Sequence, residues 1–193
     1  MKHKIIILTG KSASGKGLVE NKLVKNGFKR IITYTTRPPR DKERDGIDYN
    51  FVTEHHFLQL IRENELVEYR KYNTEFGVWY YGSSANSIDL NKHDYVITLT
   101  LDGAEAFVNY FGAENCIVFY IDAPKSVREK RAESRDPQGF NKDEWDRRVK
   151  TDNADFAFEK VAKICNFRID NYNKPIYNLI KEIKDDIKVW KNG

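Results

Sequence analysis

Apolar runs and amphipathic segments alternate along most of the chain. Four short runs rich in β-branched and aromatic residues predict buried strands: KIIIL at 4–8, YVITLTL at 95–101, CIVFYI at 116–121 and NFRI at 166–169. Apolar residues that recur every three or four positions predict helices at 18–24, 104–110, 126–134 and 176–190. Because strands and helices alternate, we expect an α/β fold in which helices cover both faces of a parallel sheet. The last helix is expected to pack on this core.

The alternation stops between about residues 33 and 90. A polar segment, RPPRDKERDG, is followed by YNFV, by a helical EHHFLQLIREN, and by two alternating runs, LVEYRKY and FGVWYYG, around Asn73-Thr74. Two such runs with a short polar turn predict an antiparallel hairpin. We therefore expect a small α+β lobe at 33–90 inserted into a core formed by 1–32 and 91–193. A second polar interruption, SRDPQGFN, lies between arginine-bearing helices and predicts a short lid at about 135–147.

Composition narrows the class of protein. The 193 residues include 33 basic and 29 acidic side chains, a net charge of +4, which suits small anionic ligands and does not argue for nucleic acid. No apolar run approaches the ~20 residues that span a bilayer, and MKHKIIIL is too short for a signal peptide. Cys116 and Cys165 are expected to be reduced core thiols. We expect a cytoplasmic protein, monomeric or homodimeric, with no membrane partner.

A glycine-rich loop follows the first predicted strand and precedes the first predicted helix. The segment GKSASGK at 10–16 has the G-x-x-x-x-G-K spacing, in which main-chain amides and a helix N-terminus surround a phosphate and the lysine adds a positive charge. A plain glycine turn beside a solvated lysine is the alternative, and the flanking strand and helix argue against it. The candidate ATP-phosphate site comprises Gly10, Ser12, Ala13, Ser14, Gly15, Lys16 and Gly17.

Gly17 stands where a Ser or Thr hydroxyl usually binds Mg²⁺ directly. Its absence leaves the amides and Lys16 in place, and Mg²⁺ keeps several waters by preference. We therefore expect no direct protein ligand: the metal would be held by nucleotide phosphates and water. The G-K-G sequence at 15–17 resembles the loop of adenylate kinases and some guanylate kinases, and this resemblance favours a nucleotide kinase over a GTPase-like switch protein.

A second candidate anion site lies in TYTTRPPR at 33–40. Arg37 and Arg40, on a proline-stiffened segment, could present two guanidinium groups to one phosphate, and the Tyr49 hydroxyl could join them. Taken alone, this segment could equally be a solvated basic loop.

The ordered series T-x-T-T-R-x-P-R, G-x-D-Y-x-F, Val67-Glu68-Tyr69 and Tyr80-Tyr81-Gly82-Ser83 resembles the GMP-binding region of guanylate kinases. With the glycine loop and the basic lid segment, the resemblance covers nearly the whole chain. It implies a P-loop kinase core that binds ATP with Mg²⁺ as cofactor and phosphorylates GMP and dGMP. In the acceptor site, the resemblance assigns the phosphate to Arg37, Arg40, Tyr49 and Tyr81, the guanine edge to Glu68, and hydroxyl positions near the base to Thr33 and Ser83.

Glu68 suits guanine chemically, because an ionised carboxylate only accepts hydrogen bonds and guanine offers two adjacent donors. The alternative is that Glu68 merely pairs with a Lys or Arg on the hairpin. The chain departs from the family at Thr98 and Thr100, where aspartates are usual, and one of these aspartates helps to hold the guanine amino group. Thr100 could accept the same hydrogen bond, without the charge.

The candidate catalytic cations are Lys16 of the glycine loop and three arginines later in the chain. Arg131 and Arg135 are four residues apart on one predicted helix, Arg148 follows the lid, and similarly placed arginines in guanylate kinases close over both nucleotides. For Arg147 we expect an ordinary exposed ion pair, and an Arg148–Asp152 pair is the corresponding alternative for Arg148.

Three further readings remain. The acceptor could be another nucleoside monophosphate or a phosphorylated sugar. The chain could be a non-catalytic guanylate-kinase-like module that binds a phosphorylated partner, although such modules typically lose the loop lysine that is present here as Lys16. Nucleic-acid binding is the least favoured, because the basic residues cluster where two small-ligand phosphates belong.

Overall fold

The structure is a computed structural model, and it describes residues 3–74 and 77–192. Its core is a five-stranded sheet in the order β2-β7-β1-β8-β9, and every pairing in it is parallel. The strands are β1 (Ile5–Thr9), β2 (Lys29–Arg30), β7 (Tyr95–Thr98), β8 (Cys116–Asp122) and β9 (Phe167–Asp170). The predicted parallel α/β core is confirmed.

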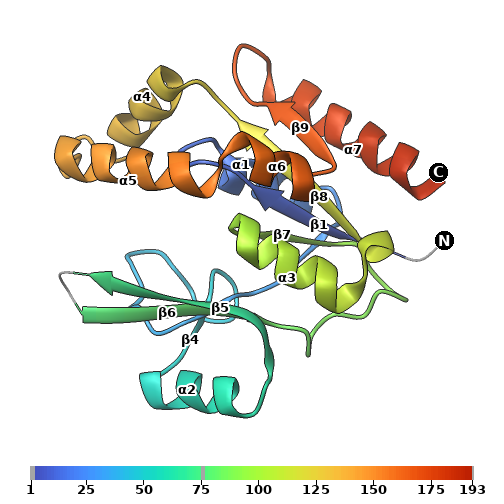
Figure 1. Ribbon diagram of the computed structural model, residues 1–193, viewed down its shortest axis with the longest axis horizontal. Coiled ribbons are helices and arrows are strands. Elements are labelled where there is room, and N and C mark those ends of the chain that lie inside the picture. The colour runs from blue at the N-terminus through green and yellow to red at the C-terminus, as the bar shows by residue number, and fades with distance from the viewer. Residues whose placement is uncertain (1–2, 75–76, 193) are drawn as a thin grey trace.

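Helices cover both faces of this sheet (Figure 1). They are α1 (Lys16–Lys25), α3 (Leu101–Phe111), α4 (Lys125–Arg135), α5 (Lys142–Asp155), α6 (Phe158–Ile164) and α7 (Ile176–Asn192), with a 3₁₀ turn η1 (Ala113–Asn115). Successive strand residues face opposite sides, so Ile6 packs with α1 and α7 while Ile7 packs with α3. Leu179 and Ile183 of α7 are fully buried, which confirms that the C-terminal helix packs on this core.

A second sheet, in the order β4-β3-β6-β5, forms the lobe below the core in Figure 1. It comprises β3 (Tyr34–Thr35), β4 (Asn50–Phe51), β5 (Leu66–Thr74) and β6 (Gly77–Ser84), with α2 (Glu54–Arg62) packed against it. The ring of Phe57 in α2 packs against the ring of Tyr80 in β6, with the two ring centroids 5.4 Å apart. The predicted hairpin is confirmed for β5 and β6, and the part of it at 75–76 lies outside the described residues.

The strand predicted at 95–101 is too long. It ends at Thr98, because the Thr100 hydroxyl accepts the Gly103 N–H (3.3 Å) and begins α3 as its N-cap. The short elements β2, β3 and α6 were not predicted, since two residues of strand or seven of helix carry too little periodicity.

The predicted lid falls at a helix boundary. Helix α4 ends at Arg135 and α5 begins at Lys142, so the polar interruption connects two long helices. Both cysteines are free, as predicted, and burial raises the pKa of each thiol to about 12. Within the described ranges, no helix is long and apolar enough to cross a membrane.

Candidate active site

The glycine loop connects the end of β1 to the start of α1, as predicted. Gly10 and Gly15 have φ of 144° and 99°, and Ala13 also lies in the left-handed region at 58°. Helix α1 begins at Lys16, and within the described residues no side chain caps its N-terminus. The first-turn amides and the helix dipole are therefore free to hold an anion.

Two of the loop glycines are required by close packing. A Cβ on Gly10 would lie 2.3 Å from the Ile121 carbonyl oxygen, and one on Gly15 would lie 2.2 Å from the Asn171 side-chain nitrogen. Gly17 differs, because no described heavy atom comes within 4 Å of its Cβ position. A serine would fit there, so packing does not require glycine at this position. The loop differs from its usual form here only in lacking the hydroxyl.

Lys16 is folded back onto the loop. Its ammonium donates to the carbonyl oxygens of Gly10 (2.6 Å) and Lys11 (3.1 Å). Burial lowers the pKa of Lys16 to about 8, the nearby Asp152 carboxylate opposes this shift, and Arg128 adds to it. The buried Ser14 hydroxyl has no hydrogen-bond partner among the described residues, as expected of a polar group at a ligand site.

The sequence singles out four arginines near the lid: Arg131, Arg135, Arg147 and Arg148. Of these four, Arg131 contacts the glycine loop. Arg131 donates to the carbonyl oxygens of Ser14 (3.1 Å) and Asn171 (2.7 Å), and the Asn171 amide also donates to Ser14 (2.8 Å). Asn171, which follows β9, was not among the predicted site residues. Arg135 lines the same open hollow on α4 as Arg131 but is exposed.

Arg147 and Arg148 both bind Glu144, at 2.6 and 2.7 Å, and are exposed. These hydrogen bonds, that from Arg147 above all, lower the pKa of Glu144 to about 2 against the opposing effect of burial. The exposed ion pair predicted for Arg147 is confirmed. Arg148 also forms an exposed ion pair, as its alternative had it, but the partner is Glu144 and not Asp152. Catalytic roles for Arg135 and Arg148 stay predictions.

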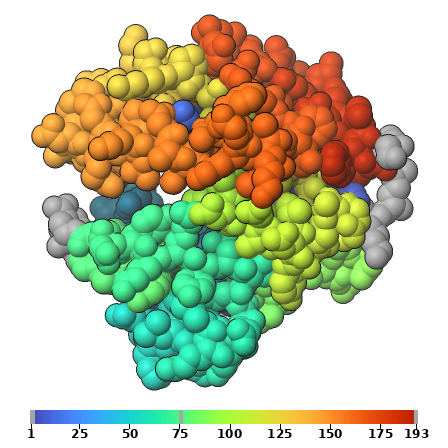
Figure 2. All heavy atoms as spheres, viewed as in Figure 1, coloured from blue at the N-terminus to red at the C-terminus, as the bar shows by residue number. Residues whose placement is uncertain are grey.

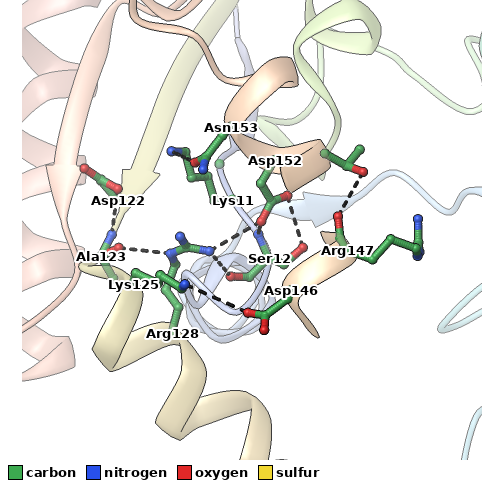
Figure 3. Close-up of polar contacts among 12 residues, drawn as sticks. Lys11, Ser12, Asp122, Ala123, Lys125, Arg128, Asp146, Arg147, Asp152 and Asn153 are labelled. Carbon is green, nitrogen blue, oxygen red and sulfur yellow. Dashed lines mark hydrogen bonds and ion pairs between the residues drawn. The ribbon is translucent and has the colours of Figure 1, made fainter. Parts of the chain in front are cut away.

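Asp152 contacts the glycine loop and not Arg148 (Figure 3). This is the first of two loop contacts that the sequence did not reveal. Asp152 accepts hydrogen bonds from the Ser12 amide (2.8 Å) and hydroxyl (3.1 Å). Arg128 of α4 donates to the Ser12 carbonyl oxygen (3.1 Å). Both contacts join residues more than 110 positions apart, so no local pattern could have identified them.

The lobe brings together three of the four residues assigned to the acceptor phosphate. The Arg37 Nε donates to the Tyr81 hydroxyl (3.1 Å), and the Arg37 guanidinium lies 5.4 Å from the centre of the Tyr49 ring. The Tyr49 and Tyr81 rings meet edge to face at 6.0 Å. The Arg40 side chain is exposed and its main-chain N–H donates to Glu43 (2.8 Å).

Glu43 forms an ion pair with the guanidinium of Arg37. Its two carboxylate oxygens accept from Arg37 Nη2 at 3.0 and 2.9 Å. Burial alone would raise the pKa of Glu43, but the hydrogen bonds from Arg40 and Arg37 lower it overall. An internal carboxylate therefore sits on the arginine assigned to the acceptor phosphate. Glu43 was not predicted, although a carboxylate among arginines three and six residues away was a visible signal.

The residues assigned to the base also lie together. The hydroxyls of Thr33 and Ser83 are 3.5 Å apart, and Glu68 lies opposite Ser83 in the β5–β6 ladder. Thr100 Oγ1 and Glu68 Oε2 lie 3.3 and 3.4 Å from the Cβ position of Gly103, so they share one corner at the start of α3. Burial raises the pKa of Glu68, against smaller effects of Ser83 and Arg70.

The alternative for Glu68 was an ion pair with a cation of the hairpin. Arg70 of the hairpin is near enough to lower the pKa of Glu68, but its ion pair is with Asp102 of α3, at 2.5 Å. The role of Glu68 toward the base stays a prediction. Thr98 donates to Glu20 of α1 (3.2 Å), which also pairs with Arg30 (3.5 Å). A carboxylate from α1 thus stands beside the strand where the family usually carries aspartate, and Glu20 was not predicted.

The surface of the molecule is hollowed between the lobe and the core. In Figure 2 the surface is recessed between the lobe (green) and the α5 segment (orange), and a dark blue-green segment lies at the back of the recess. The arrangement offers one cradle of main-chain amides and one of arginine and tyrosine, each suited to a phosphate.

Comparisons with known proteins agree with this geometry. A family model described as guanylate kinase matches residues 2–166. The chain is 31% identical to a guanylate kinase of Prochlorococcus marinus subsp. pastoris, covering 92% of this chain and 97% of that one, and 26% identical to one of Bdellovibrio bacteriovorus, covering 97% and 99%. The crystal structure of a guanylate kinase from Anaplasma phagocytophilum has the same fold, with a TM-score of 0.69, 20% identity, and coverage of 98% and 87%. The chain belongs to the guanylate kinase family of enzymes.

Proposed function

We propose that the protein transfers the γ-phosphoryl group of ATP to GMP and dGMP, forming ADP and the nucleoside diphosphate. The observation that carries this proposal is the half-buried Glu68 carboxylate, which lies opposite Ser83 in the β5–β6 ladder, in the lobe that also holds the Arg37–Tyr81 pair. Guanine can donate two hydrogen bonds to such a carboxylate, whereas adenine presents an acceptor there and would leave Glu68 desolvated and unpaired. Because the assigned groups address the phosphate and the base, the 2′-hydroxyl is not required, which supports dGMP.

On the ATP side, the β- and γ-phosphates would lie on the amides of the loop from Ser12 to Gly17. Lys16 would exchange its bonds to the Gly10 and Lys11 carbonyls for phosphate oxygens. Mg²⁺, when bound with ATP, would neutralise phosphate charge. The open space beside Gly17 suits a metal-bound water, so we propose that the nucleotide and water hold the metal.

On the acceptor side, the GMP phosphate would displace Glu43 from Arg37 and join Arg40, Tyr49 and Tyr81. A phosphate dianion is a stronger partner for a guanidinium than one carboxylate, and it fits the same bidentate geometry. Arg37 is almost completely buried, with 4% of its side chain exposed, so its attraction for the phosphate is weakly screened.

The chemical step needs alignment and charge neutralisation more than a protein nucleophile. We propose that the lobe (33–90) and the lid (about 135–147) close on the core (1–32 and 91–193) when both nucleotides bind. Closure would bring an acceptor phosphate oxygen in line with the γ-phosphorus and exclude water that would otherwise hydrolyse ATP. Arg131, Arg135 and Arg148 would then stabilise charge on the transferred group.

The test is the acceptor range of the purified protein. ADP formation is followed with ATP, Mg²⁺ and each of GMP, dGMP, AMP, CMP, UMP and dTMP. Turnover confined to GMP and dGMP is the expected result. Equal turnover with AMP would refute the role of Glu68, and ADP formation with none of the six would refute the proposed function and favour a phosphorylated-sugar acceptor or a binding module.

A further inference from the structure

Ser12 of the glycine loop is held on both sides by opposite charges. Its amide and hydroxyl donate to the Asp152 carboxylate of α5, at 2.8 and 3.1 Å, while its carbonyl oxygen accepts from Arg128 of α4 at 3.1 Å. Arg128 and Asp152 also contact each other at 3.4 Å. Figure 3 shows the two side chains converging on Ser12 from the two helices that flank the predicted lid.

The pair is buried and well supported. Only 3% of the Arg128 side chain and 12% of the Asp152 side chain are exposed. Arg128 donates its Nε to the Ala123 carbonyl (3.1 Å) and lies 5.8 Å from the centre of the Trp145 ring. A buried ion pair is rarely more stabilising than apolar packing of the same volume. We therefore look for the role of this ion pair in the loop main chain that it holds in place.

The pair also acts on Lys16, the loop cation. Two charged side chains influence Lys16 from the helices packed over the loop: Asp152 from α5, which favours the ammonium form, and Arg128 from α4, which disfavours it. The groups in direct contact with the Lys16 ammonium are the carbonyls of Gly10 and Lys11. Asp152 therefore raises the pKa of Lys16, whereas Arg128 lowers it.

We propose that Arg128 and Asp152 are positioning residues that fix the ATP-phosphate loop at Ser12 and tie it to the two helices that carry the lid arginines. The proposal rests on the proposed kinase function and adds two residues to it. Each contacts the loop main chain and neither belongs to the set assigned from the sequence. Their effect should be confined to the ATP side, because the acceptor cluster of Arg37, Tyr49 and Tyr81 belongs to the lobe built on the second sheet.

The first test compares Asp152→Asn with Asp155→Asn. Asp155 is the last residue of the same helix, is exposed and lies outside the predicted lid, so it is a matched control. We expect Asp152→Asn to raise the KM for ATP by about tenfold, given that a misplacement of ~1 Å can cost on the order of 10²-fold. The KM for GMP should change little, and Asp155→Asn should change neither.

The second test measures how kcat/KM for ATP depends on pH. Residues with a purely structural role would not shift this profile in opposite directions. The profile of kcat/KM for ATP reports groups of the free enzyme, so loss of the Lys16 proton should appear as its alkaline limb near pH 8. Asp152→Asn removes a charge that raises the pKa of Lys16, so the limb should move to lower pH. Arg128→Met removes a charge that lowers this pKa, so the limb should move to higher pH. Shifts in the same direction, or none, would overturn the proposal.

Direct binding separates this proposal from the kinase assignment. Calorimetric titration with ATP and Mg²⁺ measures the affinity of the protein for ATP when no acceptor is present. It therefore remains informative even if GMP is not the substrate. Weaker ATP binding by Asp152→Asn, with unchanged binding by Asp155→Asn, supports the proposal. Should a single variant fail to fold, as judged by its thermal transition, the double variant Asp152→Asn/Arg128→Met leaves no buried unpaired charge; ATP affinity equal to wild type in that folded protein would overturn the proposal.

Discussion

The two phosphate cradles are built in different ways. The ATP cradle is contiguous: its amides and Lys16 come from residues 10–17, at the junction of a strand and a helix. The acceptor cradle is assembled from separate segments, since Arg37 meets Tyr81 across 44 residues and meets Tyr49 through ring contacts. A contiguous cradle is fixed by local backbone geometry, whereas an assembled one depends on the sheet that holds its parts in register.

Each cradle also contains a protein carboxylate, and the two carboxylates differ in their surroundings. Asp152 is neutralised by the buried Arg128 and bonds to the main chain of the loop. Glu43 lies in a loop of the lobe, bonds to the Arg37 side chain, and keeps 20% of its own side chain exposed. We infer that Asp152 is a lasting part of its cradle, while Glu43 gives way when a phosphate arrives.

The largest effect is expected from Lys16→Ala, which removes the mobile cation of the contiguous cradle. We expect kcat/KM to fall by about 10²–10³-fold, which corresponds to the ~3–4 kcal/mol of a lost preorganised donor. Steady-state ADP formation measures it. Lys11→Ala is the matched control, because Lys11 belongs to the same loop but donates to Asn153 of α5. If Lys16→Ala kept most of its turnover, the ATP site would be misassigned.

Glu68→Gln tests the base corner of the assembled cradle. We expect kcat/KM for GMP to fall by about 30-fold, because the amide places a donor against a guanine donor, and a buried unpaired group costs ~1–3 kcal/mol. The KM for ATP should stay constant. Since burial raises the pKa of Glu68, wild-type GMP binding should weaken on acidification at pH values above the ordinary carboxyl range, and Glu68→Gln should lose that limb. An unchanged acid limb in the variant would contradict this assignment.

Glu43→Gln tests whether the internal carboxylate competes with the acceptor. Removing its charge should free the Arg37 guanidinium, so we expect GMP to bind about threefold more tightly, in the range of a partly exposed ion pair. Calorimetric titration with GMP measures this affinity. Glu63→Gln is a matched control, because Glu63 is the C-cap of α2 and its carboxylate accepts from Gln59. Weaker GMP binding would show instead that Glu43 holds Arg37 in its working orientation.

Local patterns predicted the elements and the contiguous cradle well, because strand, glycine turn and helix N-terminus are adjacent in the sequence. Periodicity located β1, β8, α1 and α7 to within a few residues, but it extended β7 to residue 101, since a threonine hydroxyl caps α3 where the apolar run continues. The arginine–tyrosine cluster was found through the family resemblance and not through spacing. Asp152 was considered only as a partner for Arg148, because its contact with Ser12 spans 140 residues.

The smallest effect is expected at Gly17, the position that distinguishes this loop from one with a hydroxyl ligand. Gly17→Ser places its side chain in open space, so the fold and the loop amides should be unaffected. The new hydroxyl could replace one metal-bound water, and Mg²⁺ tolerates such an exchange without changing its coordination number. We expect the Mg²⁺ concentration for half-maximal activity at fixed ATP to fall by about twofold, a gain within the small net value of one added polar contact. Gly17→Ala is the control, because it fills the same space without a hydroxyl; an equal gain in both variants would assign the effect to helix propensity and leave the metal without a protein ligand.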